Sequence, residues 1–273
     1  MKKTISIAAM LFFSVHSIAQ QELVIPYGNN AIYGVVSTPF TRQNGQKRGV
    51  AIISHGFNGT HHFGVDYFKT LDSLGYQVYS FDFPYGSVHS QSGNNTMNMS
   101  VVDEKNALKA IVRFFRSQKD IDKHDIVLIG ESQGGLVSAL AASELRKQVR
   151  ALVLVYPAFC IPDNWNSRYP DVESIPDTTR LWDVPLGKRY FIEVRDINPY
   201  KTISAYKGPV LVIHGDKDNV VPLSYSEKSV DVYKHASLKV ISGAGHGFSA
   251  EQRKVSNQHV CDFLNHLIKR TPK

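Results

Sequence analysis

The feature of this sequence that most constrains the fold is a repeated alternation of short apolar runs with longer amphipathic segments. Short runs that are apolar on both faces are typical of strands buried in a parallel sheet. An alternating series of strands and helices predicts a doubly wound α/β fold, with a mostly parallel sheet and helices on both of its faces. The expected strands are residues 50–54, 77–81, 126–129, 151–155, 210–214 and 238–241, and the expected helices are residues 65–74, 101–117, 134–145, 224–234 and 252–269.

Two segments depart from this alternation. Residues 23–26 and 32–38 are joined through Gly28-Asn29-Asn30 and predict an antiparallel hairpin ahead of the parallel strands. Residues 157–207 interrupt the alternation and are rich in Pro, Asp, Trp and Tyr. Because a structureless loop of that length is uncommon inside a compact domain, we expect short helices or a hairpin there. This segment is interpreted as a lid, inserted into one domain that covers residues 20–273.

Residues 1–19 have the pattern of a secretory signal peptide. Lys2 and Lys3 precede an apolar run at residues 5–15, and Ser17-Ile18-Ala19 follows as a cleavage site with small residues. The apolar run is shorter than the ~20 residues that cross a bilayer, so we expect no membrane span; a buried N-terminal helix is the alternative. The sequence therefore predicts an exported protein, either periplasmic or extracellular.

Charge and cysteine content exclude several other classes of protein. The formal net charge is +7, and the Lys and Arg residues are scattered along the chain. They form no basic stripe that would predict a nucleic-acid partner. Export would permit a disulfide between Cys160 and Cys261, although we favour two thiols in the core. No spacing typical of zinc ligands occurs, so neither a metal nor a cofactor is expected. The oligomeric state is not indicated.

A G-x-S-x-G pentapeptide, residues 130–134, lies between the predicted strand at 126–129 and the predicted helix at 134–145. That context is the one in which the motif forms a sharp strand-to-helix turn, which lifts the serine hydroxyl above the sheet. Its glycines let the strand and the helix approach each other without a steric clash. We therefore predict that Ser132 is a nucleophile.

A serine nucleophile needs a base within hydrogen-bonding distance and a group that orients this base. His246 is the predicted base, because it lies in a glycine-rich loop after the last predicted strand. Two candidate acids, Asp216 and Asp218, follow the strand at residues 210–214. Both agree with the chain order of Ser, acid and His that accompanies a G-x-S-x-G elbow, so the residues alone leave this choice open.

Residues 214–222 resemble the acid-bearing turn of many α/β-hydrolases, with the pattern His-Gly-x-x-Asp-x-x-Val-Pro. In that pattern the second aspartate, Asp218, is the member of the catalytic triad. Asp216 would then stabilise the turn through its side-chain oxygens. The resemblance implies an α/β-hydrolase fold in which Ser132, His246 and Asp218 form the triad.

An acyl-transfer site also needs backbone N–H groups aimed at the developing oxyanion. One donor is expected from Gln133, the residue after the nucleophile. The other is expected from Phe57, in the segment Ser54-His55-Gly56-Phe57 that follows the strand at residues 50–54. The alternative for this segment is a simple tight turn, which would leave the serine without a second donor.

Nearly the whole chain resembles the feruloyl and cinnamoyl esterases of gut bacteria, α/β-hydrolases with a small lid inserted before the acid-bearing strand. Residues 98–102 and 186–191 are the most particular part of this resemblance. Relatives usually carry Gly-His-Gly where residues 84–89 of this chain read Pro-Tyr-Gly-Ser-Val-His, beside the acyl side of the cleft. The resemblance also rests on residues 32–36, 55–57, 81–83, 130–135, 198–200, 214–222 and 243–246.

In these esterases the lid closes over the aromatic acid, and polar lid residues bind its phenolic hydroxyl. The resemblance implies that Asp163 and Tyr190 bind substrate here. The aromatic side chains of the lid suit a planar hydroxycinnamoyl group, although most of them are expected to form a small core that holds the lid together. These aromatic residues are Trp165, Tyr169, Trp182, Tyr190 and Phe191.

The leading hypothesis is a secreted carboxylic ester hydrolase that forms an acyl-enzyme on Ser132. Its substrates would be small phenolic esters or feruloylated plant cell-wall polysaccharide. Alternatives on the same fold are a general short-acyl carboxylesterase, a serine peptidase and a thioesterase. A hydrolase-fold binding protein without activity is the alternative from another class, and a complete set of triad residues argues against it.

Overall fold

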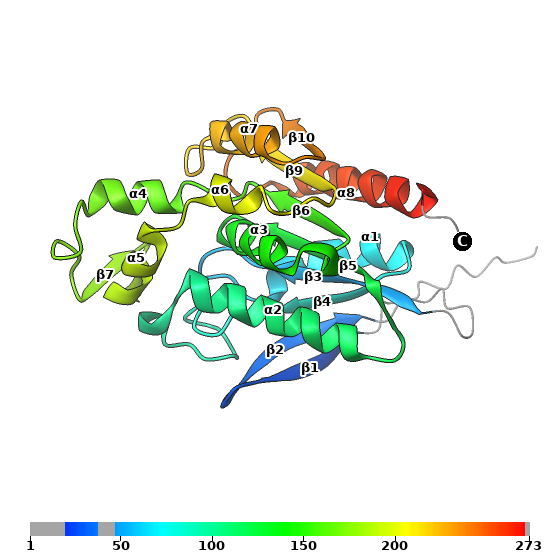
Figure 1. The fold of residues 1–273 in the computed structure, drawn as a ribbon, viewed down its shortest axis with the longest axis horizontal. Helices are drawn as coiled ribbons and strands as arrows, with labels where there is room; N and C mark the ends of the chain where they lie inside the picture. The colour runs from blue at the N-terminus through cyan, green and yellow to red at the C-terminus, as the bar shows by residue number, and fades with distance from the viewer. Residues whose placement is uncertain (1–19, 38–46, 271–273) are drawn as a thin grey trace, which may run out of the picture.

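A mixed sheet of eight strands forms the centre of the computed structural model, which describes residues 20–37 and 47–270 (Figure 1). The strand order is β1-β2-β4-β3-β5-β6-β9-β10. β2 pairs antiparallel with β1 and with β4, and the other neighbouring strands of this sheet are parallel. The strands are β1 (Gln20–Tyr27), β2 (Asn30–Ser37), β3 (Arg48–Ser54), β4 (Gln77–Phe81), β5 (Ile121–Glu131), β6 (Ala151–Val155), β9 (Val210–Gly215) and β10 (Ala236–Ile241).

Helices cover both faces of the sheet, which confirms the predicted doubly wound α/β fold. α1 packs against α8 on one face, and α2 packs against α3 on the other. Alternate residues of a strand point to opposite faces. Accordingly, Val50 and Ile52 of β3 join the core under α2 and α3, whereas Ala51 and Ile53 join the core under α1 and α8. The helices are α1 (Val65–Ser73), α2 (Val101–Ser117), α3 (Gln133–Leu145), α7 (Leu223–Val232) and α8 (Ala250–Arg270).

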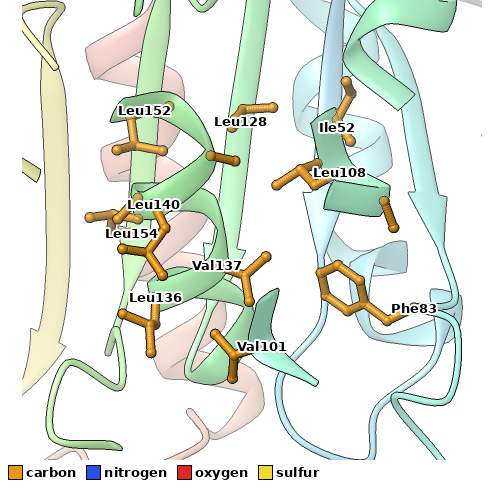
Figure 2. Packing of buried hydrophobic residues seen from close by; sticks show 14 of the residues in the cluster. Ile52, Phe83, Val101, Leu108, Leu128, Leu136, Val137, Leu140, Leu152 and Leu154 are labelled. Atoms are coloured by element: carbon orange, nitrogen blue, oxygen red, sulfur yellow. The ribbon is translucent and has the colours of Figure 1, made fainter. Parts of the chain in front are cut away.

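The helix that follows the G-x-S-x-G motif is buried along almost its whole length. Leu136 and Leu140 of α3 pack toward Leu128 of β5 and Leu152 and Leu154 of β6 (Figure 2). Burying a leucine side chain contributes on the order of 1.5–3 kcal/mol. This packing fixes where α3 begins, and therefore fixes the position of the residue before it.

The segment between β6 and β9 folds as a helix, a two-stranded hairpin and two further short helices. The first helix, the hairpin and the second helix form the left end of the molecule in Figure 1, and the last helix lies beside α3. Both kinds of structure expected for the predicted lid, short helices and a hairpin, are thus present. The elements are α4 (Ile161–Arg168), β7 (Thr178–Leu181), β8 (Val184–Gly187), α5 (Lys188–Arg195) and α6 (Pro199–Ile203).

The hairpin and α5 are attached to the chain around the start of α2. The Thr96 hydroxyl donates a hydrogen bond to the Pro185 carbonyl oxygen at 2.6 Å. The Arg189 guanidinium lies 2.8 Å from the Asp103 carboxylate, although an exposed pair of this kind contributes at most about 1 kcal/mol. These contacts hold the lid in one place relative to the sheet.

The predicted signal peptide, residues 1–19, lies outside the described residues. In the part of the chain that the structure describes, no helix has both the length and the apolar character needed to cross a membrane. Cys160 is buried and Cys261 is half-buried, and both are free thiols.

Candidate active site

Ser132 occupies the sharp turn between β5 and α3, with φ 52° and ψ −120°. Positive φ is uncommon for a residue with a side chain, and here the glycines around the serine make it possible. A Cβ atom on Gly130 would lie 2.3 Å from the Gly134 carbonyl oxygen, and one on Gly134 would lie 2.3 Å from the His55 carbonyl oxygen. Both positions therefore require glycine, as the motif indicates.

The structure brings Ser132, His246 and Asp218 into one hydrogen-bonded chain. Ser132 Oγ lies 2.9 Å from His246 Nε2, and His246 Nδ1 lies 2.8 Å from Asp218 Oδ2. His246 comes from the loop between β10 and α8, and Asp218 from the loop after β9. Because a carboxylate accepts the Nδ1 hydrogen, Nε2 is left as the acceptor that faces the serine hydroxyl.

The carboxyl group of Asp218 is enclosed and strongly bound. Its side chain is 0 % exposed. Oδ1 accepts hydrogen bonds from the N–H groups of Val220 (2.9 Å) and Val221 (2.8 Å). Burial alone would raise the pKa of this carboxyl, but hydrogen bonds from His214, His246 and the Val221 N–H outweigh burial and lower the pKa. Asp218 is therefore ionised at neutral pH.

Of the two candidate acids, only Asp218 contacts His246. Asp216 is exposed and accepts a hydrogen bond from the Gly243 N–H at 2.6 Å. That bond joins the loop after β9 to the start of the loop that carries His246. Asp216 thus stabilises a turn, as the sequence pattern implies.

The segment predicted to hold the oxyanion runs close past the nucleophile. A Cβ atom on Gly56 would lie 3.1 Å from the Ser132 Cβ atom. His55 Nδ1 donates to the Gly56 carbonyl oxygen at 2.7 Å, and His55 Nε2 accepts from the Phe83 N–H at 3.0 Å. Burial lowers the pKa of His55 to about 4, so this imidazole stays neutral and holds the segment in place.

The two predicted oxyanion donors directly follow the residues that make this close approach, Phe57 after Gly56 and Gln133 after Ser132. No described residue accepts a hydrogen bond from the Phe57 N–H. Gln133 is the first residue of α3, and the first N–H groups of a helix have no partner within the helix. Both N–H groups are therefore available to a negatively charged oxygen near Ser132.

The side chain of Gln133 is held by the lid and by α2. The Tyr190 hydroxyl donates to Gln133 Oε1 at 2.8 Å, and Gln133 Nε2 donates to both carboxyl oxygens of Glu104 at 3.0 and 2.9 Å. Tyr190 is 1 % exposed. Its hydroxyl is thus already bound to a residue of the site, which favours a role in holding Gln133 over the predicted contact with a phenol.

Asp163, the other predicted lid residue, is exposed in the first turn of α4 and accepts a hydrogen bond from the Tyr225 hydroxyl at 2.9 Å. The lid residue that lies against the oxyanion segment is instead Trp182. Its ring is 65 % exposed and meets the Phe57 ring edge-on, at 5.7 Å between centroids. The remaining aromatic residues of the lid pack on one another as the expected small core: Trp165, Tyr169, Tyr190 and Phe191.

The segment that departs from the esterase pattern, residues 84–89, is bound to the oxyanion segment. Asn58 has φ 54°, and its side-chain oxygen accepts from the Ser87 hydroxyl (3.1 Å) and the Val88 N–H (3.0 Å). A cavity of about 620 Å³ opens beside these residues, and His62 and Arg253 also line it. Substitutions in residues 84–89 are therefore expected to change the position of Asn58 and of the neighbouring Phe57.

Sequence reasoning gave no role to three buried residues around these groups, namely His214, Glu104 and Tyr156. His214 Nε2 lies 3.2 Å from Asp218 Oδ2, and Glu104 binds Gln133. The ring of Tyr156 lies against His246, with centroids 4.8 Å apart. The only sequence signal for His214 is its place at the start of the acid-bearing pattern, and the other two have none. Among the described residues, no three His, Cys, Asp or Glu side chains are grouped so that they could hold a metal ion.

Comparisons with known proteins found similar chains over most of the sequence. The chain is 27 % identical to an esterase/lipase-type protein of Mycoplasma pneumoniae over 270 residues, which is 84 % of this chain and 93 % of that protein. Est1E from Butyrivibrio proteoclasticus, solved with ferulic acid bound, is 26 % identical with a TM-score of 0.82, over 91 % of this chain and 100 % of that chain. Mouse alpha/beta hydrolase domain-containing protein 10 shares the fold at 17 % identity, with a TM-score of 0.70 over 90 % of this chain and 99 % of that chain.

The family comparison covers most of the chain. The model of the prolyl oligopeptidase family matches residues 70–271, which include the elbow, the acid-bearing turn and the loop of His246. The fold, the strand-to-helix turn and this match lead to one assignment. The chain is an α/β-hydrolase and belongs to the prolyl oligopeptidase family.

Proposed function

We propose that this protein is a serine carboxylic ester hydrolase that prefers hydroxycinnamoyl esters. The observation that carries the proposal is the continuous hydrogen-bonded chain from Asp218 through His246 to Ser132 Oγ. Ser132 itself lies on a turn with positive φ, directly before Gln133 and close to Gly56, which precedes Phe57. Such an arrangement supplies a nucleophile, a base and oxyanion donors together.

The chemistry follows from these positions. His246 Nε2 takes the proton from Ser132 Oγ as this oxygen attacks the ester carbonyl carbon, and the carbonyl oxygen gains a negative charge. The N–H groups of Phe57 and Gln133 donate hydrogen bonds to that oxygen. The imidazolium then gives its proton to the departing alkoxide. Asp218 stays ionised throughout and stabilises the positive charge on the imidazole.

The second half of the reaction uses the same residues. Water replaces the alcohol, His246 accepts its proton, and the hydroxide attacks the acyl carbon on Ser132. Collapse of this second oxyanion breaks the bond between the acyl carbon and Ser132 Oγ, and the proton returns from His246 to the serine. The products are a carboxylic acid and an alcohol, with no cofactor consumed.

The acyl preference is proposed from the lid. Trp182 is exposed beside Phe57, so a flat aromatic acyl group bound to Ser132 would have an aromatic side chain to pack against. The likeness to Est1E, which has been solved with ferulic acid bound, supports the same acyl class. Phenolic esters, either small or attached to plant cell-wall polysaccharide, are therefore the substrates to test first. We also propose that the protein is exported to the periplasm or beyond it, and the signal-peptide pattern of residues 1–19 supports this.

A peptidase is the second candidate, because the family whose model matches is that of prolyl oligopeptidase. The same three residues would cleave an amide by the same steps, with an amine in place of the alcohol. The two functions differ in the leaving group that the site accepts, so proline-containing dipeptide amides are the substrates that separate them. A thioester distinguishes the thioesterase alternative in the same assay.

The experiment is to measure kcat/KM of residues 20–273 for methyl ferulate beside p-nitrophenyl acetate and butyrate, with Ser132→Ala as control. Preference for ferulate over both short esters is expected. Good activity on the short esters with none on ferulate would replace the hydroxycinnamoyl proposal by a general short-acyl esterase. Failure of a fluorophosphonate probe to label Ser132 would contradict the enzyme proposal itself and favour a binding protein.

A further inference from the structure

A fully buried carboxyl group lies directly beside the nucleophile and takes no part in the mechanism above. Glu131 is the last residue of β5, precedes Ser132, and is 1 % exposed. Its Oε1 accepts a hydrogen bond from the Tyr67 hydroxyl at 2.7 Å, and its Oε2 accepts one from the Tyr156 hydroxyl at 2.5 Å. Because a buried carboxyl without partners is costly, these two hydroxyls are fixed in place.

The backbone at Tyr156 is also fixed, in a conformation that few residues adopt. Tyr156 directly follows β6 and has φ 37°. Its N–H donates to the Ile213 carbonyl oxygen at 2.7 Å, while the Ser132 N–H donates to the carbonyl oxygen of the preceding Val155 at 3.0 Å. Positive φ at a bulky residue persists only where surrounding contacts enforce it, and such positions gather at functional sites.

This conformation directs the phenol ring of Tyr156 onto His246. The two rings lie 4.8 Å apart between centroids with an angle of 57°. On its other side, the Tyr156 ring meets Phe248 edge-on, at 4.8 Å and 88°. The tyrosine is therefore clamped at its hydroxyl by Glu131 and at its ring by the loop that carries His246.

His246 needs such a contact, because its hydrogen bonds restrain it in one direction only. Asp218 binds Nδ1 and Ser132 faces Nε2, which leaves the ring free to tilt about the line that joins the two nitrogens. The loop itself contains Gly243 (φ 72°) and Gly247 (φ 78°), so its backbone offers little resistance. The Tyr156 ring, packed against the imidazole, would restrict this tilt.

We propose that Tyr156 is a positioning residue for His246, and that the buried Glu131 carboxyl holds Tyr156 in the orientation this requires. The proposal rests on the proposed function in one respect, namely that His246 is the base. Burial, followed by the nearby Glu131, raises the pKa of the Tyr156 hydroxyl well above its ordinary value, so this hydroxyl keeps its proton at neutral pH. The hydroxyl therefore remains a donor to Glu131.

The test compares two substitutions at Tyr156 with one matched control. Tyr156→Leu removes the ring, and Tyr156→Phe keeps the ring but removes the hydroxyl that Glu131 binds. Tyr206→Phe is the control, because Tyr206 is equally buried but donates to the Val149 carbonyl oxygen, away from the site. Rates are divided by the number of sites that a fluorophosphonate titrates, so loss of folded protein does not count as loss of rate.

We expect Tyr156→Leu to lower kcat for p-nitrophenyl acetate by about 10- to 100-fold with little change in KM, as for a misplaced catalytic group. Tyr156→Phe should give a kcat between those of Tyr156→Leu and the wild-type chain, because it keeps the ring but loses the hydrogen bond to Glu131, and Tyr206→Phe should lower Tm only. A wild-type kcat in Tyr156→Phe would overturn the part of the proposal that concerns Glu131. If Tyr156→Leu lowered Tm while kcat per titrated site stayed at the wild-type value, Tyr156 would be a purely structural residue and the proposal would be overturned.

A second measurement does not depend on hydrolysis. In nitrogen-15 spectra of the histidine side chains, the His246 ring should give one sharp set of signals in the wild-type chain and in Tyr206→Phe. In Tyr156→Leu these signals should broaden or split as the ring samples more than one tilt. Unchanged His246 signals in Tyr156→Leu would contradict the positioning role, even if the chain proved to have no esterase activity.

Discussion

The loops around Ser132 and the lid over them are positioned by different physical means. Around the nucleophile, close backbone approaches leave no space for a side chain, as at Gly130 and Gly134, and each catalytic group has its own hydrogen-bond partner. The lid has one such close approach, of Gly187 to the Met97 carbonyl oxygen, and its aromatic side chains pack on one another. Short-range steric and hydrogen-bonding demands are specific to residue type, whereas packing can be met by many combinations of apolar residues.

Tyr190 connects the two regions. It belongs to the lid, yet its hydroxyl binds the side chain of Gln133, whose N–H is a proposed oxyanion donor. One residue of the lid therefore helps to hold the side chain of the residue that follows Ser132. Substitutions around Ser132 and substitutions in the lid should therefore differ in how strongly they change the rate.

The largest effect is expected at the nucleophile. Ser132→Ala should lower kcat on the order of 10⁶-fold, because no other described residue offers a hydroxyl to His246 Nε2. The Tm should stay close to that of the wild-type chain, since among the described residues the Ser132 hydroxyl forms a hydrogen bond only with His246. Rate measurements with a thermal unfolding scan check both statements. Residual activity of a few per cent would show that hydrolysis uses another residue.

The two aspartates after β9 provide the next comparison. Asp218→Asn should lower kcat on the order of 10⁴-fold, because the amide presents the wrong hydrogen-bonding group to His246 Nδ1. Asp216→Asn should leave kcat nearly unchanged and cost about 1 kcal/mol of unfolding free energy, from its bond to the Gly243 N–H. The same ester assay measures both chains. A larger loss in Asp216→Asn would identify Asp216 as the triad acid.

Glu104, the buried residue of α2 that binds Gln133, should make the unfolding free energy depend on pH. Burial raises the pKa of Glu104 to about 8 from an ordinary value of 4.5. Between these values the folded chain holds a proton that the unfolded chain releases, so stability falls as pH rises. Glu104→Gln should remove this fall in unfolding free energy. Each unit of pKa difference corresponds to ~1.4 kcal/mol, so the fall is on the order of a few kcal/mol.

Urea unfolding at pH 5 and pH 8 measures this difference for both chains. The comparison with Glu104→Gln is needed because His55 acts in the opposite direction. Its folded pKa of about 4 makes stability rise with pH up to the unfolded value near 6.5. An equal change in the wild-type chain and in Glu104→Gln would mean that Glu104 does not titrate with the raised pKa.

A smaller effect should separate two roles of Tyr190. If its hydroxyl acts through Gln133, Tyr190→Phe should lower kcat by about fivefold on ferulate and acetate esters alike, the equivalent of one hydrogen bond. If instead the hydroxyl binds the substrate phenol, only the hydroxylated cinnamate should be affected. Methyl cinnamate without the phenolic hydroxyl is the matched substrate control.

The smallest effect is expected at Asp163, on the lid surface. The sequence resemblance predicts that Asp163→Asn harms hydroxylated cinnamates more than plain acyl esters. The carboxylate is exposed and accepts a bond from Tyr225, so the selective loss should be modest. kcat/KM for methyl ferulate and methyl cinnamate measures it. An equal loss on both substrates would remove Asp163 from the phenol site.

Regular elements with a strong pattern were predicted closely, and irregular ones were not. The strands at residues 77–81 and 151–155 and the helix at residues 101–117 have the expected bounds. β5 begins at Ile121, ahead of the expected residue 126. The prediction missed this start because residues 122–125 are charged and show no strand pattern, although Ile121 pairs with Arg48 of β3. A charged stretch lacks the apolar pattern of a strand, so it can be assigned to a strand only when the strand that pairs with it is known.

The same contrast holds within the site. The elbow, the order of the catalytic residues and the segment of Phe57 could be predicted because each depends on neighbours in the sequence. The role proposed for Tyr156 could not be predicted, because it depends on contacts with Glu131, 25 residues earlier in the chain, and with His246 on another loop. The lid predictions had the same difficulty, since the sequence shows aromatic residues but not which way each one faces.

The sequence by itself determined the alternation that builds the sheet, the glycines that permit the elbow and the chain order of serine, acid and histidine. These depend on local sterics and on periodicity, which are properties of neighbouring residues. The resemblance of residues 214–222 already favoured Asp218 over Asp216, and only the tertiary structure decided that Tyr190 turns inward to Gln133 and that Trp182 lies exposed beside Phe57. These outcomes depend on distances between segments far apart in the chain, which are set when the whole core packs.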